Sequence, residues 1–434
     1  MSKVIEDQLS AKTTSLLLKS SALCKFCLTR QGVSPKYYVK GSSVHPPDCE
    51  ICGGLLSRLP SISRAVTKEL RGYEFASFLV GTTISQRILD KEDEIRSKFK
   101  IKGREGIKAQ ITKSISNHVS QYTRKKIDYN RPELTLLVTL PDGSVSLNPR
   151  SIWLFLKYLK TKRGLAQRST LCSVCNGVGC ANCNYKGIAN SSIQNQVTVF
   201  LCKKFKAENC NFIWIGSEDE NSLVSGNGRP FYVEILRPKL RKVSRNFFRK
   251  MTNLDGVGII PQAFIATKPR TSTQFMMKCL VYLMQKPEEG QEANFHLSKE
   301  DIESKFRERS VQVKLSRKFR IVTRIVHSVE VKKVDDHHPY VLDIDCDGGI
   351  PIRKLVSGQD QIVSPNLSSF IHGLEVDPEM PFDILDISFS TAETLAPNPH
   401  KADANKKPRN WQQQKELSLT ESSLSDSDLI LEEC

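Results

Sequence analysis

Eight of the 13 cysteines fall into two groups that have the spacing of metal ligands. In the first group, Cys24 and Cys27 form one Cys-x-x-Cys pair, and Cys49 and Cys52 form another, with 21 residues between the pairs. Two such pairs offer four thiolates to one tetrahedral ion, as a zinc ribbon does. Disulfides or inert buried thiols are the alternative, which is uncommon for this spacing inside cells. The first group therefore predicts a structural zinc site.

The second group lies in residues 171–187, which read LCSVCNGVGCANCNYKG. Its cysteines are close enough to bind one ion, and the glycines between them let the backbone fold tightly around it. A redox turn or a purely structural turn is the alternative. The candidate ligands are Cys172, Cys175, Cys180 and Cys183. Five further cysteines have no such spacing and are expected to be ordinary residues: Cys202, Cys210, Cys279, Cys346 and Cys434.

A third chemical feature is the acidic stretch GSEDENSLVSGNGRPFYVEI at residues 216–235. It places Glu218, Asp219 and Glu220 before a Gly-Asn-Gly sequence that favours a tight turn, and a strand-like apolar run follows. A carboxylate in this position can act as a nucleophile, an acid or a base. On these residues alone, a solvated acidic turn is the commoner explanation.

The charge of the chain narrows the choice of partner. The 434 residues include 64 Lys and Arg against 47 Asp and Glu, which gives a net charge of +17. This excess favours a polyanion, either a nucleic acid or an anionic membrane surface. The sequence has no apolar run of about 18 residues, no signal segment, no lipidation motif and no long basic amphipathic helix. A nucleic acid is therefore the expected partner, membrane association is not expected, and the chain is expected to be intracellular.

Apolar periodicity predicts the elements that would position these groups. Residues 1–60 predict a helix and the ribbon, and residues 73–84, YEFASFLVGTTI, predict a strand. A helix follows, in which Ile107, Ile111, Ile115 and Val119 recur on one face. Residues 131–150 predict two strands joined by a Pro-Asp-Gly turn. Together they predict a compact α/β domain.

The second half of the chain predicts a large mixed-sheet domain, because strands and helical stretches alternate from Val197 to Phe389. Residues 150–168 interleave three aromatic and six basic side chains, so they form either a half-buried strand or helix or an element that faces nucleic acid. The basic residues of 233–250 and of the alternating stretch 309–330 would face phosphates. Residues 390–434 lose all periodicity and predict a disordered tail with an acidic end.

The order of these pieces resembles the archaeal and eukaryotic THUMP-containing tRNA pseudouridine synthases, the tenth family of that enzyme class. The resemblance rests on the ribbon, on YEFASFLVG followed by EDEIRSKF, on the second cysteine group and on GNGRPF. It continues through RSVQVKLSRK, KKVDDHHPYVLDIDCDGG and IRKLVSG, and so spans roughly residues 20–388.

The resemblance implies an α+β, multi-domain fold with an N-terminal zinc ribbon, a THUMP-like α/β domain and a C-terminal pseudouridine-synthase catalytic domain built on a mixed sheet. The expected domains are the helix and ribbon at 1–60, the THUMP-like RNA-binding domain at 61–168, the cysteine cluster at 169–190, the catalytic domain at 191–389 and the tail at 390–434.

The family places its catalytic aspartate in a motif that ends in G-x-G-R-P-F, and this motif assigns the nucleophile position to Asp219. A basic residue beside the carboxylate would keep it ionised, and Arg229 of the same motif could serve. The motif departs from the family pattern at Ser217, Asn221, Ser222 and Leu223. The substrate-binding positions that the resemblance implies are Arg229, Met277, Pro351, Ile352 and Arg353.

Two of these positions lack the residue that the family expects. A tyrosine that would stack on the target base falls on Met277, and a second tyrosine falls on Pro351. Methionine can pack against a base but has no π-face. Either Phe275 or Tyr282 supplies the ring, or the active site is divergent.

The implied function is a cytoplasmic, monomeric tRNA pseudouridine synthase that converts uridines 54 and 55 of the T-arm through an aspartate nucleophile. It would need structural Zn2+ and no organic cofactor. The N-terminal domains would hold the acceptor end, and the catalytic domain would receive a flipped uridine. The alternative is a tRNA-binding or remodelling protein of the same fold that has weakened or lost its catalysis. A DNA-binding zinc protein is disfavoured, because the sequence lacks a helix-turn-helix pattern and zinc-finger histidine spacing.

Overall fold

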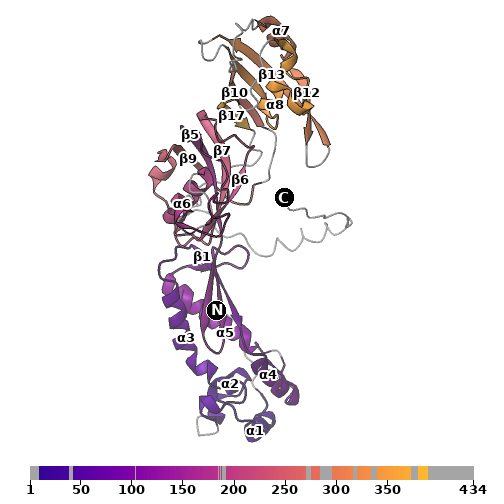
Figure 1. Ribbon diagram of the computed structural model, residues 1–434. Coiled ribbons are helices and arrows are strands. Elements are labelled where there is room, and N and C mark those ends of the chain that lie inside the picture. The colour runs from indigo at the N-terminus through magenta and orange to yellow at the C-terminus, as the bar shows by residue number, and fades with distance from the viewer. Residues whose placement is uncertain are drawn as a thin grey trace, which may run out of the picture. The chain divides into compact units, whose positions relative to one another are not determined.

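The computed structural model describes residues 9–38, 43–102, 104–183, 185, 187, 192–269, 275–283, 296–315, 320–333, 340–372 and 380–389 (Figure 1). The predicted disordered tail, residues 390–434, lies outside this part of the chain. All described residues belong to one unit, Met1–Thr394. They form helices and mixed sheets, so the predicted α+β class is confirmed. None of the described helices has the length and apolar character needed to cross a membrane.

The N-terminal helices begin or end close to the cysteines of the first group. Cys24 directly precedes one helix, and Cys52 lies shortly before another. All four cysteines of the group are buried in the same apolar core as the first sheet. The helices are α1 (Ala11–Ser20), α2 (Lys25–Arg30) and α3 (Leu55–Glu69), with the short 3-10 helices η1 (Pro35–Tyr37) and η2 (Pro46–Asp48) between α2 and α3.

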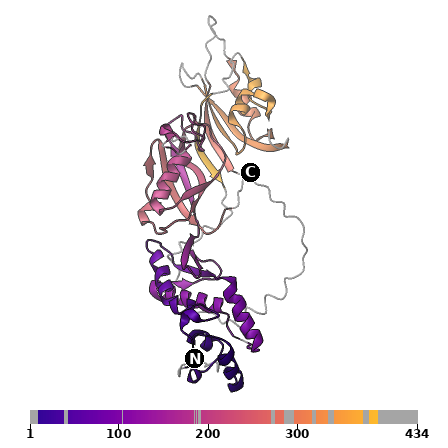
Figure 2. The same cartoon turned by 60° about the horizontal axis from the view of Figure 1, so that its bottom comes forward.

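The first sheet has four strands in the order β2-β1-β3-β4 (Figure 1 and Figure 2). Strand β1 pairs in parallel with β2 and β3, and β3 pairs antiparallel with β4. The predicted strand, the periodic helix and the two strands joined by a turn are confirmed as β1, α5 and β3-β4. The elements are β1 (Ser77–Thr83), α4 (Gln86–Lys98), α5 (Ile107–Thr123), β2 (Lys126–Ile127), β3 (Leu134–Thr139) and β4 (Ser144–Pro149).

The second sheet has eleven strands in the order β15-β12-β13-β14-β10-β17-β7-β5-β9-β8, with β6 paired to β7. Its strands are β5 (Ile152–Lys160), β6 (Asn209–Trp214), β7 (Val224–Leu236), β8 (Thr252–Leu254), β9 (Val257–Ile265), β10 (Phe275–Leu283), β12 (Arg309–Leu315), β13 (Arg320–Lys332), β14 (Tyr340–Asp347), β15 (Val363–Ser364) and β17 (Phe382–Phe389). The helices that accompany it are η3 (Ala181–Cys183), α6 (Ile193–Phe205), η4 (Arg245–Phe248), α7 (Lys299–Lys305), α8 (Ile352–Ser357), η5 (Gln359–Gln361) and η6 (Ser368–Phe370), and β11 (His296–Leu297) pairs separately with β16 (Ile371–His372).

Strand β5 shows which of the two predicted structures residues 150–168 form. It pairs with β7 and β9, so it belongs to the eleven-stranded sheet, although the sequence placed it with the smaller domain. Its rings Trp153, Phe155 and Tyr158 are all less than 10% exposed and pack in the core. The predicted strand is therefore correct, although both of its faces are largely buried, and a nucleic-acid-facing aromatic surface here is wrong. The rings provide apolar area that the sheet needs to bury.

The Gly-Asn-Gly sequence forms a bulge within β7, so the predicted tight turn is wrong. Tyr158 of β5 lies opposite Arg229, whereas Lys160 lies opposite Val224, so one residue of β5 faces residues 225–228. Gly226 and Gly228 have φ values of 59° and 75°, which favour glycine. The bulge fixes the direction in which the side chain of Arg229 leaves the strand.

Residues 309–330 are strands β12 and β13, which pair antiparallel. The predicted alternation holds on β12, where Val311 and Val313 are buried and the residues beside them are exposed. The predicted single strand is thus a pair of strands. The connection at 316–319 lies outside the described residues.

Candidate active site

Asp219 lies on the loop between β6 and β7. Its Oδ1 accepts a hydrogen bond from the Asn221 N–H at 2.9 Å and lies 2.9 Å from Nη2 of Arg353. The Ser222 N–H donates to the Asp219 carbonyl at 3.1 Å, which closes the loop into a turn. The Asp219 side chain is 27% exposed, so the carboxylate is held in place and is still open to a ligand. This combination suits a nucleophile or a general base.

Arg353 enters the site from the first turn of α8. Its Nε donates to the Met380 carbonyl at 3.0 Å, and its guanidinium lies 5.9 Å from the centre of the Phe382 ring. Pro351 caps this helix, and Ile352 is 3% exposed, so both set the position of Arg353 from the core side. Among the predicted positions 351 to 353, only Arg353 contacts Asp219 in the described part of the chain.

Arg229 does not lie beside Asp219, contrary to the expectation from the sequence. Its Nη1 is 3.5 Å from Oε2 of Glu218, and its Nη2 donates to the carbonyls of Ile215 and Ser217, each at 3.1 Å. Both charged side chains are at most 1% exposed. The bulge in β7 directs Arg229 into the core, where it holds the first half of the loop. Arg353 takes the place beside Asp219 that the sequence assigned to Arg229.

Lys160 holds the same loop from β5 and was not singled out by the sequence. Its Nζ donates to the carbonyls of Asp219 and Glu220 at 3.1 and 2.8 Å and lies 3.5 Å from Oε1 of Glu218. All three acceptors belong to the tripeptide that contains Asp219. Burial lowers the pKa of Lys160, and the nearby Glu218 carboxylate opposes this effect.

Glu218 is the buried anion between these two cations. Burial raises its pKa, whereas Arg229 and then Lys160 favour the charged form. A buried carboxylate between two cations supports the shape of the loop and is closed to substrate. Glu220, in contrast, is exposed. The three neighbouring carboxylates, which look alike in the sequence, therefore have three different environments.

The end of the loop is tied to β17. Arg163 makes two hydrogen bonds to the Asp383 carboxylate, at 2.7 and 2.8 Å, and its Nη1 donates to the Asn221 carbonyl at 2.5 Å. Asp383 also accepts from the Leu223 N–H at 2.9 Å. This paired geometry is the strong form of a charge-assisted hydrogen bond. Sequence reasoning missed both residues, because 220 positions separate them and neither lies in a motif.

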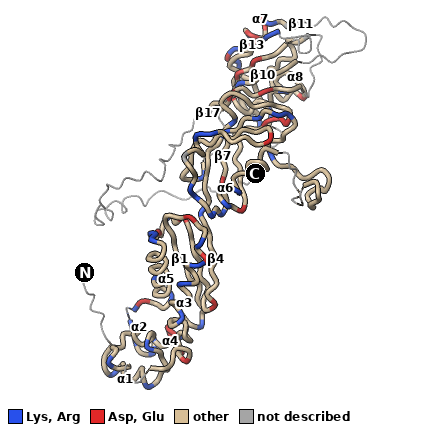
Figure 3. The backbone as a smooth tube through the Cα atoms, turned by 90° about the vertical axis from the view of Figure 1, so that its left-hand side faces the viewer, with Lys and Arg blue, Asp and Glu red and all other residues tan. Residues whose placement is uncertain are grey.

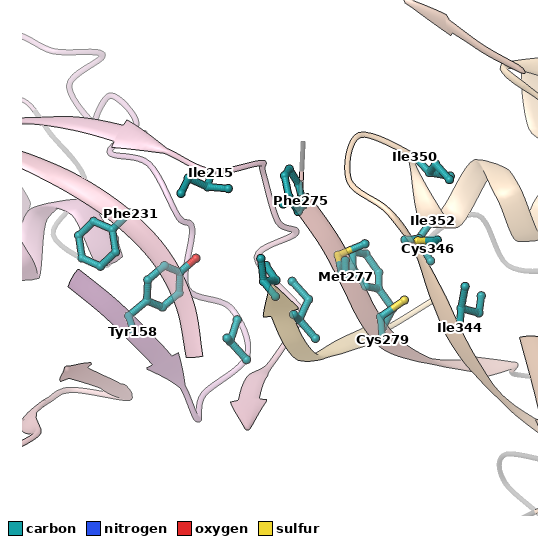
Figure 4. Packing of buried hydrophobic residues seen from close by; sticks show 14 of the residues in the cluster. Tyr158, Ile215, Phe231, Phe275, Met277, Cys279, Ile344, Cys346, Ile350 and Ile352 are labelled. Atoms are coloured by element: carbon teal, nitrogen blue, oxygen red, sulfur yellow. The ribbon is translucent and has the colours of Figure 1, made fainter. Parts of the chain in front are cut away.

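Phe275 is the aromatic residue that lies against the loop. A Cβ atom at Gly216, which has a φ of +72°, would come within 2.7 Å of the Phe275 Cζ. Figure 4 shows Phe275 near Ile215, at the point where β10 begins. Phe275, which is 8% exposed, therefore packs against the start of this loop, and it is one of the two alternative rings that the sequence offered.

Met277 lies in the core and does not face Asp219. It is 6% exposed and pairs with Cys346 of β14 and Ile387 of β17, and Figure 4 places it among the buried side chains that follow Phe275. Because residues alternate along a strand, Tyr282 points to the opposite face from Phe275. Burial and the nearby Asp383 raise the pKa of Tyr282. The predicted base-contacting role of Met277 therefore has no support in the geometry.

Both cysteine groups have the geometry of a four-sulfur metal site. In each group the four Sγ atoms lie within 4.8 Å of one another, so each can hold a metal ion such as zinc. In the second group, the Cys180 and Gly187 N–H groups donate to Cys183 Sγ at 3.1 and 3.2 Å. The Cys180 bond contributes most to lowering the pKa of this thiol to about 6, which favours the thiolate that binds metal. The remaining described cysteines lie outside both groups, as expected.

Comparison with known proteins gives the family. The family model described as Pus10 THUMP domain, archaeal, matches residues 62–139, and the one described as Pus10, C-terminal, matches residues 153–257. A protein named tRNA pseudouridine synthase Pus10 from Nitrosopumilus maritimus (strain SCM1) is 30% identical over 380 residues, which cover 82% of this chain and 92% of that protein. The chain belongs to the Pus10 family. A protein of the same name from Cenarchaeum symbiosum (strain A) is 28% identical over 330 residues, covering 75% of this chain and 78% of that protein.

The two Pus10 models match the two sheets separately. The THUMP match covers most of the four-stranded sheet, and the C-terminal match begins within β5 and includes the loop that carries Asp219. Phe275 and Arg353 lie beyond the matched residues of the C-terminal model. The family resemblance inferred from the sequence is thereby confirmed.

Proposed function

We propose that the chain is a tRNA pseudouridine synthase in which Asp219 is the nucleophile and uridines 54 and 55 of the T-arm are the targets. The activity is supported by the named Pus10 relatives, and the role of Asp219 by its partly exposed carboxylate 2.9 Å from Arg353. That ion pair is the observation that carries the proposal, because it orients a carboxylate that is 27% exposed and so accessible to a ligand.

The reaction has three parts that the site can serve. The C1′–N1 bond of uridine breaks, the uracil turns, and a C1′–C5 bond forms, while N1 gains a proton and C5 loses one. Asp219 attacks the sugar or the base to start the exchange, and Arg353 orients its carboxylate. The bonds from Lys160, Arg229 and Arg163 hold the loop in one geometry. No organic cofactor is required for this exchange.

The distribution of Lys and Arg supports tRNA as the partner. Lys and Arg recur on the first sheet with its helices and on the eleven-stranded sheet (Figure 3), which suits contact with a long polyanion such as tRNA. We place the protein in the cytoplasm as a monomer that binds tRNA, with no DNA expected. The deciding experiment is conversion of uridine to pseudouridine in an unmodified tRNA transcript. Tight tRNA binding without conversion would favour the alternative of a catalytically inactive tRNA-binding protein.

Phe275 supplies the ring that the family pattern places at Met277. The Phe275→Leu variant keeps apolar volume but removes the π-face, and losing one base-stacking contact should lower kcat/KM roughly 10- to 100-fold. Affinity for tRNA should change little, because phosphate contacts dominate it. Steady-state rates on a tRNA transcript test this. The matched control is Met276→Leu, an exposed neighbour on the other face of β10, and equal losses in both variants would contradict the assignment.

Zinc is the metal proposed for the cysteine groups. We expect one to two zinc ions per chain by metal analysis and loss of N-terminal structure in the Cys27→Ser variant, because the thiolates and the first sheet share one core. The eleven-stranded sheet has its own core and should survive. Cys202→Ser, outside both groups, should leave the zinc content unchanged. An N-terminal part that stays folded after metal removal would contradict the structural role.

A further inference from the structure

The second cysteine group carries an unusual concentration of exposed apolar side chains. Leu171, Val174, Val178 and Tyr185 are 68, 64, 90 and 79% exposed. They are four of the fourteen large hydrophobic residues that are exposed in the described part of the chain, and all four fall within residues 171–185. We call these four residues the apolar knuckle. Each of them lies within two residues of a cysteine of the second group, whose four Sγ atoms lie within 4.8 Å of one another.

Folding does not explain why these residues are apolar. A loop cross-linked by a metal ion is held by its ligands and does not need an apolar core. Polar residues would serve equally well at positions that are 64 to 90% exposed. A cluster of exposed apolar residues on a soluble segment commonly marks a binding site.

The segment that carries the apolar knuckle, residues 169–192, directly follows residues that hold the loop around Asp219. Ser169 Oγ lies 3.0 Å from Ser192 Oγ, which joins the two ends of this segment. Just before it, the Gly164 and Leu165 N–H groups donate to the Glu220 carbonyl at 2.9 and 3.2 Å. Gln167 Nε2 lies 3.5 Å from the Gly216 carbonyl. The same short segment therefore contacts both ends of the loop around Asp219.

The charge of the surrounding chain identifies the class of partner. Residues 143–207 contain ten Lys and Arg but neither Asp nor Glu. Helix α6, which follows the knuckle, has Lys203 and Lys204 in its last turn. Exposed apolar and aromatic side chains within a purely basic segment suit unpaired RNA, whose bases stack while its phosphates meet the cations. A protein partner that binds through an apolar surface would not explain why this segment contains no Asp or Glu.

We propose that the apolar knuckle packs against unpaired bases of the tRNA loop that contains the target uridine. This inference rests on the proposed function, which makes tRNA the substrate. Tyr185 offers the stacking ring, and the valines offer apolar contact to a neighbouring base. The knuckle thus contributes to substrate affinity, while Asp219 and Arg353 carry out the reaction.

The test is the double variant Val178→Ser with Tyr185→Asn. Asparagine is chosen because Tyr185 has a φ of +59°, a conformation that asparagine tolerates well. The dissociation constant for an unmodified tRNA transcript and the KM should rise roughly 10- to 100-fold, as expected for the loss of one stacked base. The kcat and the slope of affinity against salt should stay unchanged, because no phosphate contact is removed. The matched control is Met251→Asn, which removes an exposed apolar side chain, 45% accessible, that lies outside the THUMP domain, the Asp219 loop and the knuckle.

The outcomes separate this inference from the proposed function. Unchanged tRNA affinity in a double variant that keeps its zinc content and melting temperature would overturn the RNA contact. So would an equal loss in the Met251→Asn control, or a native dimer that the double variant converts to a monomer. If the unmutated chain neither binds nor converts tRNA, the proposed function fails first. If it does both and the double variant does so equally well, only the knuckle inference fails.

Discussion

The Asp219→Asn variant should bind tRNA as the unmutated chain does and form no detectable pseudouridine. Asparagine keeps the size of the side chain and its Oδ1, which can still accept from the Asn221 N–H, so the turn is retained. It removes the negative charge that attacks and that pairs with Arg353. Pseudouridine content after single-turnover incubation, together with a tRNA binding titration, measures the two effects separately.

The matched control for this variant is Glu220→Gln. Glu220 is exposed and adjacent in sequence, so loss of its charge should leave turnover close to normal. Glu218→Gln is not an equivalent control, because Glu218 is buried between Lys160 and Arg229. Near-normal activity of Asp219→Asn would show that the motif assignment is wrong. Asp343 would then be a poor replacement candidate, because it is 6% exposed and already pairs with Lys332 at 2.9 Å.

Sites and elements whose residues lie close together along the chain could be predicted from the sequence. The two cysteine groups are each defined by short intervals, and the structure brings each of them together. The assignment of Asp219 as the nucleophile depends on the family motif that ends in GNGRPF, and it stays a prediction. The periodic helix was predicted correctly because Ile107, Ile111, Ile115 and Val119 lie on one face and are all buried.

The partners of Asp219 could not be predicted in the same way. Arg353 comes from a helix 134 positions further along the chain, and only the folded sheet brings it to 2.9 Å. Arg229, ten positions away, was the natural choice, but the bulge in β7 directs it to Glu218. Met277 shows the limit of a motif alignment. It occupies the expected position in sequence, yet it lies on the same buried face of β10 as Phe275 and pairs with Cys346 and Ile387 deeper in the sheet.

Lys160 shows why a buried cation escapes sequence reasoning. Among six basic residues in residues 150–168, nothing in the sequence separates it from the solvent-facing Lys and Arg. It is 1% exposed in the structure, and taking a charge out of water is costly unless its hydrogen bonds are satisfied. All of its described acceptors lie in residues 218–220. The cost of burial is thus offset by bonds to the loop that carries Asp219, which makes Lys160 a positioning residue.

The Lys160→Met variant should therefore lose about 100-fold in kcat with little change in KM, because a shift of about 1 Å in a reacting group has an effect of this size. Methionine keeps most of the side-chain length but donates no hydrogen bond to the carbonyls of Asp219 and Glu220. Arg229 remains as the partner of Glu218, so the buried carboxylate is not left without a cation. Rates over a range of tRNA concentrations separate kcat from KM.

Two further variants distinguish positioning from a general loss of stability. Lys157→Met changes a half-buried lysine of the same strand that does not contact the loop, so its kcat should stay normal. Lys160→Arg keeps the charge and donors and should recover part of the lost rate, although the larger guanidinium fits the site less well. If Lys160→Met loses rate only in proportion to its folded fraction, as measured by thermal melting, the lysine stabilises the fold without positioning Asp219. A normal kcat for fully folded Lys160→Met would show that Arg229 and Arg163 are sufficient to hold the loop.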